Sequence, residues 1–202
     1  LASRKNLEGV KIMDRAERQV RSSTQPFQTR DGENGKKYIS GYFAVFNSNY
    51  ELWPGATESI DPHAFDEELT GDIRCLIDHK TRLVIGRTKS GTLTLKVDDI
   101  GLWGEVEINP ADQDALNLYE RVKRGDVDQC SFGFEIVSEE FSEHDGVVHW
   151  TIKQVRLYEV SVVTFPAYEE TSVSARKREL EDIKKRKLET WKQNAMKKLK
   201  GE

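Results

Sequence analysis

The chain has 202 residues, of which 37% are hydrophobic and 33% charged, so it can bury one full core but gives little support for two independent domains. Its formal net charge is only −4, which excludes the strong basic excess of a typical nucleic-acid-binding protein. The charges are unevenly spread, because residues 175–200 hold eleven Lys or Arg against four Asp or Glu. We therefore expect an acidic body with a basic tail, and no specific nucleic-acid partner.

Both cysteines, Cys75 and Cys130, lie in apolar, strand-like runs. This placement favours buried free thiols in a reducing compartment over a disulfide framework. No run approaches the roughly 20 apolar residues that a membrane-spanning helix needs. Residues 1–20 are charged throughout, so we expect neither a membrane anchor nor a signal peptide.

In the first half of the chain, the highly charged residues 1–16 are expected to form a loose arm. The first clear strand covers Lys37–Phe46, and Asp61 followed by Pro62 is typical of a helix start. A strand is expected over Asp72–His79, with His79 on the same face as Cys75 and Ile77. Three more strands are predicted at Val84–Thr88, Leu93–Val97 and Leu102–Ile108.

The second half starts with a helix opened by Asn109 and Pro110 and ended by Gly125. Strands follow around Ser131, then, after a turn at 144–146, over 147–153 and along the apolar run 155–165. A charged helix begins at about residue 175. Roughly eight strands with one or two helices predict a mainly β fold, a closed or nearly closed antiparallel β-barrel.

The strand Asp128–Ile136 alternates with period two, so its two faces differ. Cys130, Phe132 and Phe134 fall on an apolar face, while Ser131 and Gly133 share the polar one. A serine beside a glycine on that face is open to a substrate. The alternative is a small residue that a solvated face tolerates.

A serine hydroxyl is a weak nucleophile until a base takes its proton, so a catalytic Ser131 requires a histidine. Of the four histidines, His144 and His149 lie in a polar hairpin and His63 beside a proline at the expected helix start. His79 ends an apolar strand, so its ring is expected at the rim of the core, where its acidity can be tuned.

The third member of such a site should orient the imidazole and stabilise its cation. Glu159 is the only acid in Val155–Phe165, and a carboxylate on an apolar strand is costly unless it is paired. An ion pair with Arg156 is the alternative, and Asp78 is a rival for the role, although it points to the face opposite His79. Strand alternation places Glu159 with Leu157, Ser161 and Val163.

No nucleophile elbow of the Gly-x-Ser-x-Gly type, phosphate-binding glycine loop or set of zinc ligands is present in the sequence, so we expect no cofactor and no metal. Four segments do stand out: Ile60–Phe65, Leu76–Arg87, Ser131–Phe134 and Leu157–Thr171. Together they resemble the prohead maturation proteases of tailed bacteriophages. The similarity runs from about Tyr38 to Val173, in the right order.

The resemblance implies a β-barrel like that of the herpesvirus assemblins, with Ser131 as nucleophile, His79 as base and Glu159 as third member. It also implies a serine endopeptidase that cleaves scaffolding segments, of a scaffold protein or of the major capsid protein, and then itself. The place would be the procapsid interior, assembled in the host bacterial cytoplasm. Backbone N–H groups near the serine should form the oxyanion hole, and the turn at Ala167 and Tyr168 is one candidate.

We therefore expect an N-terminal arm (1–16), a protease β-barrel domain (17–174) and a charged helical tail (175–202). The tail either docks on the acidic scaffold or inner shell, or stays solvated. Self-association is expected too, because a protease active in free solution would digest the scaffold prematurely. The alternative function is a non-catalytic structural phage protein on the same barrel, either tail-tube-like or a capsid assembly component.

Overall fold

The computed structural model describes residues 19–23, 26–165 and 170–200, so the predicted arm at 1–16 lies outside the described residues. The chain divides into two compact units, Leu1–Ala167 and Tyr168–Glu202. The strands are β1 (Gln19–Ser23), β2 (Gln28–Asp31), β3 (Lys37–Val45), β4 (Tyr50–Trp53), β5 (Ala56–Ile60), β6 (Arg74–Ile77), β7 (Lys80–Arg87), β8 (Leu93–Val97), β9 (Gly101–Ile108), β10 (Gln129–His144) and β11 (Val147–Val163). The helices are η1 (Glu33–Gly35), η2 (Thr88–Ser90), α1 (Gln113–Arg124) and α2 (Glu170–Lys200).

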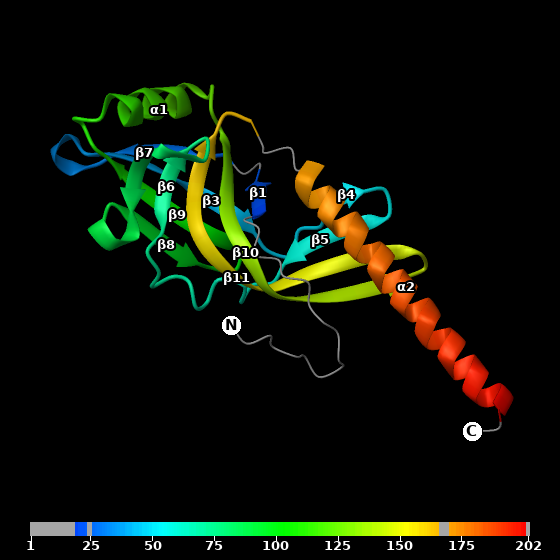
Figure 1. Ribbon diagram of the computed structural model, residues 1–202. Coiled ribbons are helices and arrows are strands. Elements are labelled where there is room, and N and C mark those ends of the chain that lie inside the picture. The colour runs from blue at the N-terminus through cyan, green and yellow to red at the C-terminus, as the bar shows by residue number, and fades with distance from the viewer. Residues whose placement is uncertain (1–18, 24–25, 166–169, 201–202) are drawn as a thin grey trace. The chain divides into compact units, whose positions relative to one another are not determined.

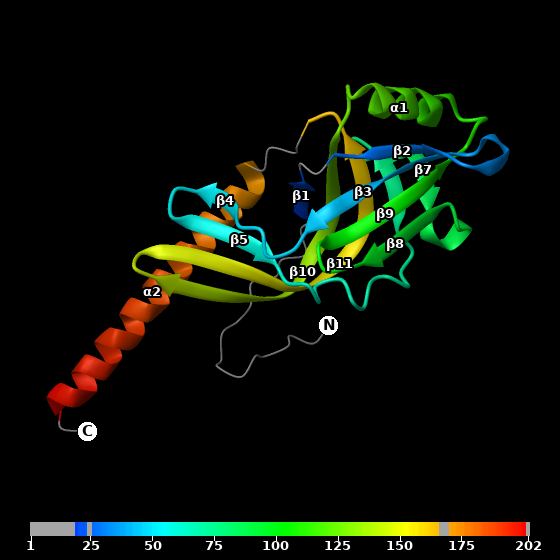
Figure 2. The same cartoon turned by 180° about the vertical axis from the view of Figure 1, so that it is seen from behind.

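The strands form two sheets (Figures 1 and 2). The larger has the order β1-β10-β11-β5-β4, with β6 also pairing with β11 and β7 pairing with β6. The smaller has the order β2-β3-β9-β8. The long β10–β11 hairpin is therefore the centre of the larger sheet: β1, β5 and β6 pair with it directly, and β4 and β7 are attached through β5 and β6.

The prediction of a mainly β fold is confirmed, but the closed antiparallel barrel is wrong. Within the described residues no ladder joins the two sheets, and both β5 and β6 run parallel to β11. The reason is the length of β11, which pairs with β5 over Val148–Ile152 and with β6 over Glu159–Val162. β11 therefore has β5 as its neighbour along its first part and β6 along its last part, and the sheet does not close into a barrel.

The segment between β5 and β6 forms turns where a helix was predicted. The Asp61 carboxylate does accept a hydrogen bond from the His63 N–H at 2.9 Å, as a cap would. It also binds the Lys153 ammonium, and the Asp61 N–H donates to the Ile152 carbonyl at 2.9 Å. These contacts hold the segment against β11. Asp61, which resembles the cap of a helix, therefore attaches a turn to β11 and no helix follows it.

One hydrophobic cluster combines side chains of both sheets and α1. The β10 face predicted to be core is core: Phe132 stacks on Phe134 with ring centroids 4.7 Å apart, and Cys130 is fully buried. Neither cysteine forms a disulfide, and burial raises the pKa of the Cys75 thiol. A buried thiol with a raised pKa is a poor nucleophile, which leaves the chemistry to other groups.

The helix ending at Gly125 is confirmed, with its first turn shifted to Gln113. Asp112 is the cap, because its carboxylate accepts from the N–H groups of Asp114 and Ala115, and Gly125 adopts the left-handed conformation with φ 85°. The charged C-terminal helix is also present as α2. Among the described residues, no helix is both long and apolar enough to cross a membrane.

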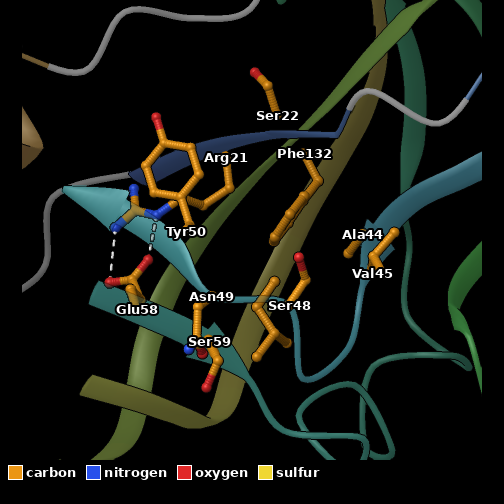
Figure 3. Close-up of a pocket in the computed structure, with 11 residues that line it drawn as sticks. Arg21, Ser22, Ala44, Val45, Ser48, Asn49, Tyr50, Glu58, Ser59 and Phe132 are labelled. Carbon is orange, nitrogen blue, oxygen red and sulfur yellow. Dashed lines mark hydrogen bonds and ion pairs between the residues drawn. The ribbon is translucent and has the colours of Figure 1, made fainter. Parts of the chain in front are cut away.

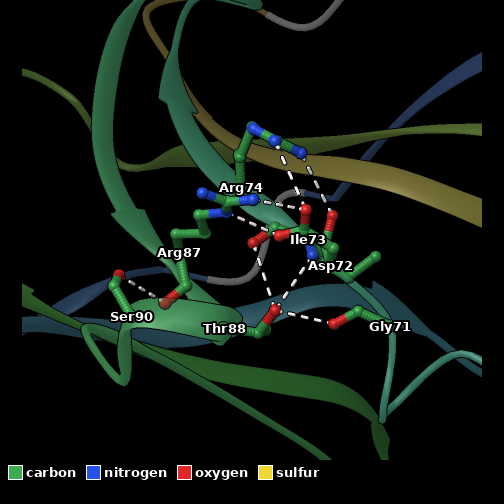
Figure 4. Close-up of polar contacts among 7 residues, drawn as sticks. All are labelled: Gly71, Asp72, Ile73, Arg74, Arg87, Thr88 and Ser90. Carbon is green, nitrogen blue, oxygen red and sulfur yellow. Dashed lines mark hydrogen bonds and ion pairs between the residues drawn. The ribbon is translucent and has the colours of Figure 1, made fainter.

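The open end of the β6–β7 hairpin is clamped by side chains (Figure 4). Arg87 donates two hydrogen bonds to the Asp72 carboxylate, at 2.6 and 2.5 Å. The Thr88 hydroxyl donates to the Gly71 carbonyl at 2.7 Å and accepts from the Ile73 N–H at 2.9 Å. Because the hairpin is fixed here, its opposite end, the turn after Ile77, has a defined position.

Asp72→Asn is expected to remove an acid-sensitive part of the stability. Arg87 lowers the pKa of folded Asp72 from 3.8 to about 2, so the carboxylate stabilises the fold above about pH 4 and stops doing so as the pH falls towards about 2. Urea unfolding should show a difference between wild type and variant that is constant above about pH 4.5 and shrinks below it. Asp99→Asn, at an exposed turn, is the control. A difference for Asp72→Asn that stays constant down to about pH 2 would contradict this.

Candidate active site

His79 lies in a hairpin turn and not on a strand, which corrects the expected strand over 72–79. β6 ends at Ile77, Ile77 pairs with Lys80 of β7, and the two residues between them are Asp78 and His79. Both have positive φ, 48° and 58°, as type I′ hairpin turns require. Non-glycine residues adopt this conformation at a cost, and such costs concentrate at functional sites. The turn therefore determines where the imidazole points.

Asp78, the rival acid, holds this turn against the end of β11. Its N–H donates to the Val162 carbonyl at 3.0 Å, and its carboxylate accepts from the Thr164 N–H at 2.9 Å. The carboxylate beside His79 belongs to another residue.

That residue is Glu159, which owes its orientation to a β-bulge. Gly133 pairs with Glu159 and Phe134 with Leu157, so Tyr158 is an extra residue in β11. A bulge reverses the alternation of faces beyond it. Leu157 belongs to the core together with Val160 and Val162, so the sequence-based placement of Leu157 on the face of Glu159 is wrong.

The Glu159 carboxylate is buried, at 2% exposure, and both its oxygens accept hydrogen bonds. Oε1 lies 2.7 Å from His79 Nδ1, and Oε2 accepts from the Ser161 hydroxyl at 2.5 Å. Because a carboxylate only accepts, Nδ1 carries the proton and the lone pair of the neutral ring is on Nε2.

The remaining imidazole nitrogen, His79 Nε2, is buried and has no hydrogen-bond partner within the described residues. The same is true of the Gln129 Oε1 atom. Buried polar atoms are nearly always paired, so an exception calls for an explanation. An acceptor held ready for a proton is one such explanation.

Ser131 lies next to Ser161 in the sheet register but is bound elsewhere. It faces Ser161 of β11 on one side and Ser22 of β1 on the other. Its side chain is fully buried, and the hydroxyl donates to the Arg21 carbonyl at 2.8 Å. Both interpretations of this face are therefore wrong, the serine open to a substrate and the small residue on a solvated face, because the side chain is buried and its hydroxyl is bound to β1. The structure brings His79 and Glu159 together, whereas the Ser131 proton is directed to β1.

The other histidines have local partners. His63 Nδ1 lies 2.9 Å from the exposed Asp66 carboxylate, and His144 pairs with Asp145 at the exposed hairpin tip. His149 bridges the Thr57 and Ser59 hydroxyls, at 2.7 and 2.9 Å. Among the described residues no group of three or more His, Cys, Asp or Glu side chains is arranged to hold a metal.

Sequence reasoning missed Ser161 as a partner of Glu159 and the buried ion pair between Arg21 and Glu58. Ser161 was detectable, since residues two apart on a strand share a face. Arg21 and Glu58 are 37 residues apart, and nothing in the sequence links them.

Comparisons with known proteins show the family of the chain. The sequence profile of the caudovirus prohead serine proteases matches residues 24–186. The chain belongs to this family. It is 30% identical over 154 residues to the prohead protease of Enterobacteria phage HK97, covering 74% of this chain and 63% of that protein. The solved structure of the bacteriophage T4 capsid assembly protease aligns with a TM-score of 0.48 and 11% identity, over 73% of this chain and 97% of that one.

Ser161→Ala is expected to destabilise the fold, because it removes a hydrogen bond to a buried carboxylate. Such bonds contribute about 1.5–3 kcal/mol, and the loss should appear as a lower free energy of unfolding in urea. Ser142→Ala, at an exposed position of β10, is the matched control and should stay within about 0.5 kcal/mol of wild type. Equal stabilities for both variants would show that Ser161 does not support Glu159.

Proposed function

We propose that this chain is a serine endopeptidase in which Ser131 is the nucleophile, His79 the general base and Glu159 the acid that orients His79. One observation carries the assignment. The His79 ring is fixed through Nδ1 on a buried carboxylate, while its Nε2 is buried and has no partner in the described part of the chain. Membership of a family of serine proteases supports the same reaction.

In the proposed mechanism, His79 Nε2 takes the Ser131 proton while Oγ attacks a peptide carbonyl carbon. Glu159 stabilises the resulting imidazolium through Nδ1–H. The imidazolium gives its proton to the leaving amine, and water then hydrolyses the acyl-enzyme. Backbone N–H groups would stabilise the oxyanion, and the candidate turn at Ala167 and Tyr168 lies outside the described residues.

The described arrangement around Ser131 is, in this proposal, a resting one. The hydroxyl donates its proton to the Arg21 carbonyl, so this bond must break before His79 can act as its base. β1 is a five-residue edge strand, and short edge strands open locally at low cost. A restrained protease of this kind would not digest its substrate before assembly.

The substrate we propose is a scaffolding segment, of a scaffold protein or of the major capsid protein, cut inside the procapsid in the host cytoplasm, with later self-cleavage. The support is membership of a prohead protease family and the name of the HK97 protein. The chain spans 63% of the length of the HK97 protein. We assign proteolysis to residues 17–174 and docking on the scaffold to the basic tail 175–202. The intact His79–Glu159 pair does not favour a purely structural role.

Co-expression with the phage's own capsid protein tests the proposal. Wild type should yield truncated capsid chains in a gel or by mass spectrometry. Ser131→Ala should abolish them, since losing the nucleophile lowers turnover by a factor on the order of 10⁴ or more. Ser142→Ala, on the same strand, should cleave like wild type. The same capsid pattern with wild type and Ser131→Ala would refute the peptidase function.

A further inference from the structure

β1 occupies the edge of the strand that carries Ser131. It runs antiparallel to β10, with Ser22 opposite Ser131, and among the described strands β10 is its one ladder partner. An extended peptide added to a sheet edge is a common way for proteins to bind polypeptide substrates. β1 lies beside β10 (Figure 1), so a substrate strand added at this edge would pass Ser131 as Ser22 does.

The contact between the two strands singles out one peptide bond. The Ser131 hydroxyl lies 2.8 Å from the carbonyl oxygen of Arg21, so the bond between Arg21 and Ser22 is the one next to the nucleophile. The hydroxyl touches the carbonyl oxygen and not the carbon. This is the contact of a strand held in the site before any attack.

The Arg21 side chain is received by a buried acid on another strand. Arg21 is 5% and Glu58 2% exposed, and Nε and Nη2 of Arg21 both donate to the Glu58 carboxylate, the latter at 3.0 Å (Figure 3). The guanidinium also lies 5.7 Å from the centre of the Phe134 ring. A two-pronged contact of this kind is selective for a planar cation.

Burying two charges costs desolvation energy that their attraction does not always recover, so a buried pair is weak evidence for a stabilising role. Recognition accounts for it better, because a buried carboxylate favours a cationic side chain opposite it. Beside the pair is a pocket of about 220 Å³, whose lining includes Tyr50, Ser59 and Phe132. A long side chain on an incoming strand has room there.

We propose that β1 is the chain's own substrate-like strand, and that Glu58 determines specificity by selecting a basic residue whose carbonyl faces Ser131. The proposal rests on the proposed peptidase function. For a substrate strand replacing β1, Oγ of Ser131 bonds to the carbonyl carbon of the basic residue and the C–N bond to the next residue breaks. His79 carries the Ser131 proton to the new amine. Water then hydrolyses the ester, which leaves a carboxylate and restores the hydroxyl.

Ten-residue synthetic peptides with the sequence of residues 17–26 test this, carrying Arg, Lys, Met or Glu at the position of Arg21. They are incubated with the full chain, and mass spectrometry gives the cut position and kcat/KM. Wild type should cut after Arg or Lys at least about tenfold faster than after Met. Glu58→Gln should lose at least about tenfold on the Arg peptide and keep its rate on the Met peptide within about twofold. Glu51→Gln, an exposed acid of β4, is the control.

The double variant Arg21→Glu with Glu58→Arg exchanges the two charges and keeps the ion pair. It therefore controls for a loss of folding caused by removing the pair. It should prefer the Glu peptide over the Arg peptide. Ser131-dependent cleavage with the same preference in wild type, Glu58→Gln and the double variant would overturn the role of Glu58 and leave the peptidase function standing. Absence of Ser131-dependent cleavage of both peptides and capsid protein would overturn the peptidase function, and this inference with it.

Discussion

The structure around the candidate site depends on one constraint: a buried carboxylate must have its hydrogen bonds satisfied inside the protein. At Glu159 this is done by three local devices. The bulge at Tyr158 turns the side chain away from the core, Ser161 supplies one donor, and the positive-φ turn brings in His79 as the other. The imidazole then has a defined tautomer, because the carboxylate fixes the proton on Nδ1. The hydrogen bond that orients the imidazole also satisfies one oxygen of the buried carboxylate.

The second element of the account is the short strand that covers the serine. β1 contributes a carbonyl to the Ser131 hydroxyl and a guanidinium to the buried Glu58, so backbone and side chain hold the strand from two directions. The same contacts would hold a substrate strand of similar sequence. The contacts that would restrain Ser131 are thus the same ones that would bind a substrate strand. Displacing β1 would expose Ser131, the edge of β10 and Glu58 together.

Local signals in the sequence predicted the local structure well. The strand Leu93–Val97 and the end of the helix at Gly125 follow from alternation and from turn chemistry, and both are found. Pairing of His79 with Glu159 was also expected, because an acid on an apolar strand needs a partner. What could not be predicted depends on tertiary structure. The bulge at Tyr158 and the second strand neighbour of β11 arise from pairing between distant segments. The cover over Ser131 comes from a segment 110 residues earlier.

The central claim is that Ser131 is a nucleophile activated by His79. It is tested most directly by labelling the full chain with a fluorophosphonate, which reacts with activated serine hydroxyls, and mapping the label by peptide mass spectrometry. The label is expected on Ser131, and His79→Ala should slow labelling by about 10²-fold or more, since a general base contributes that much. Labelling of Ser131 at the same rate in both proteins, or label distributed over other serines, would contradict it.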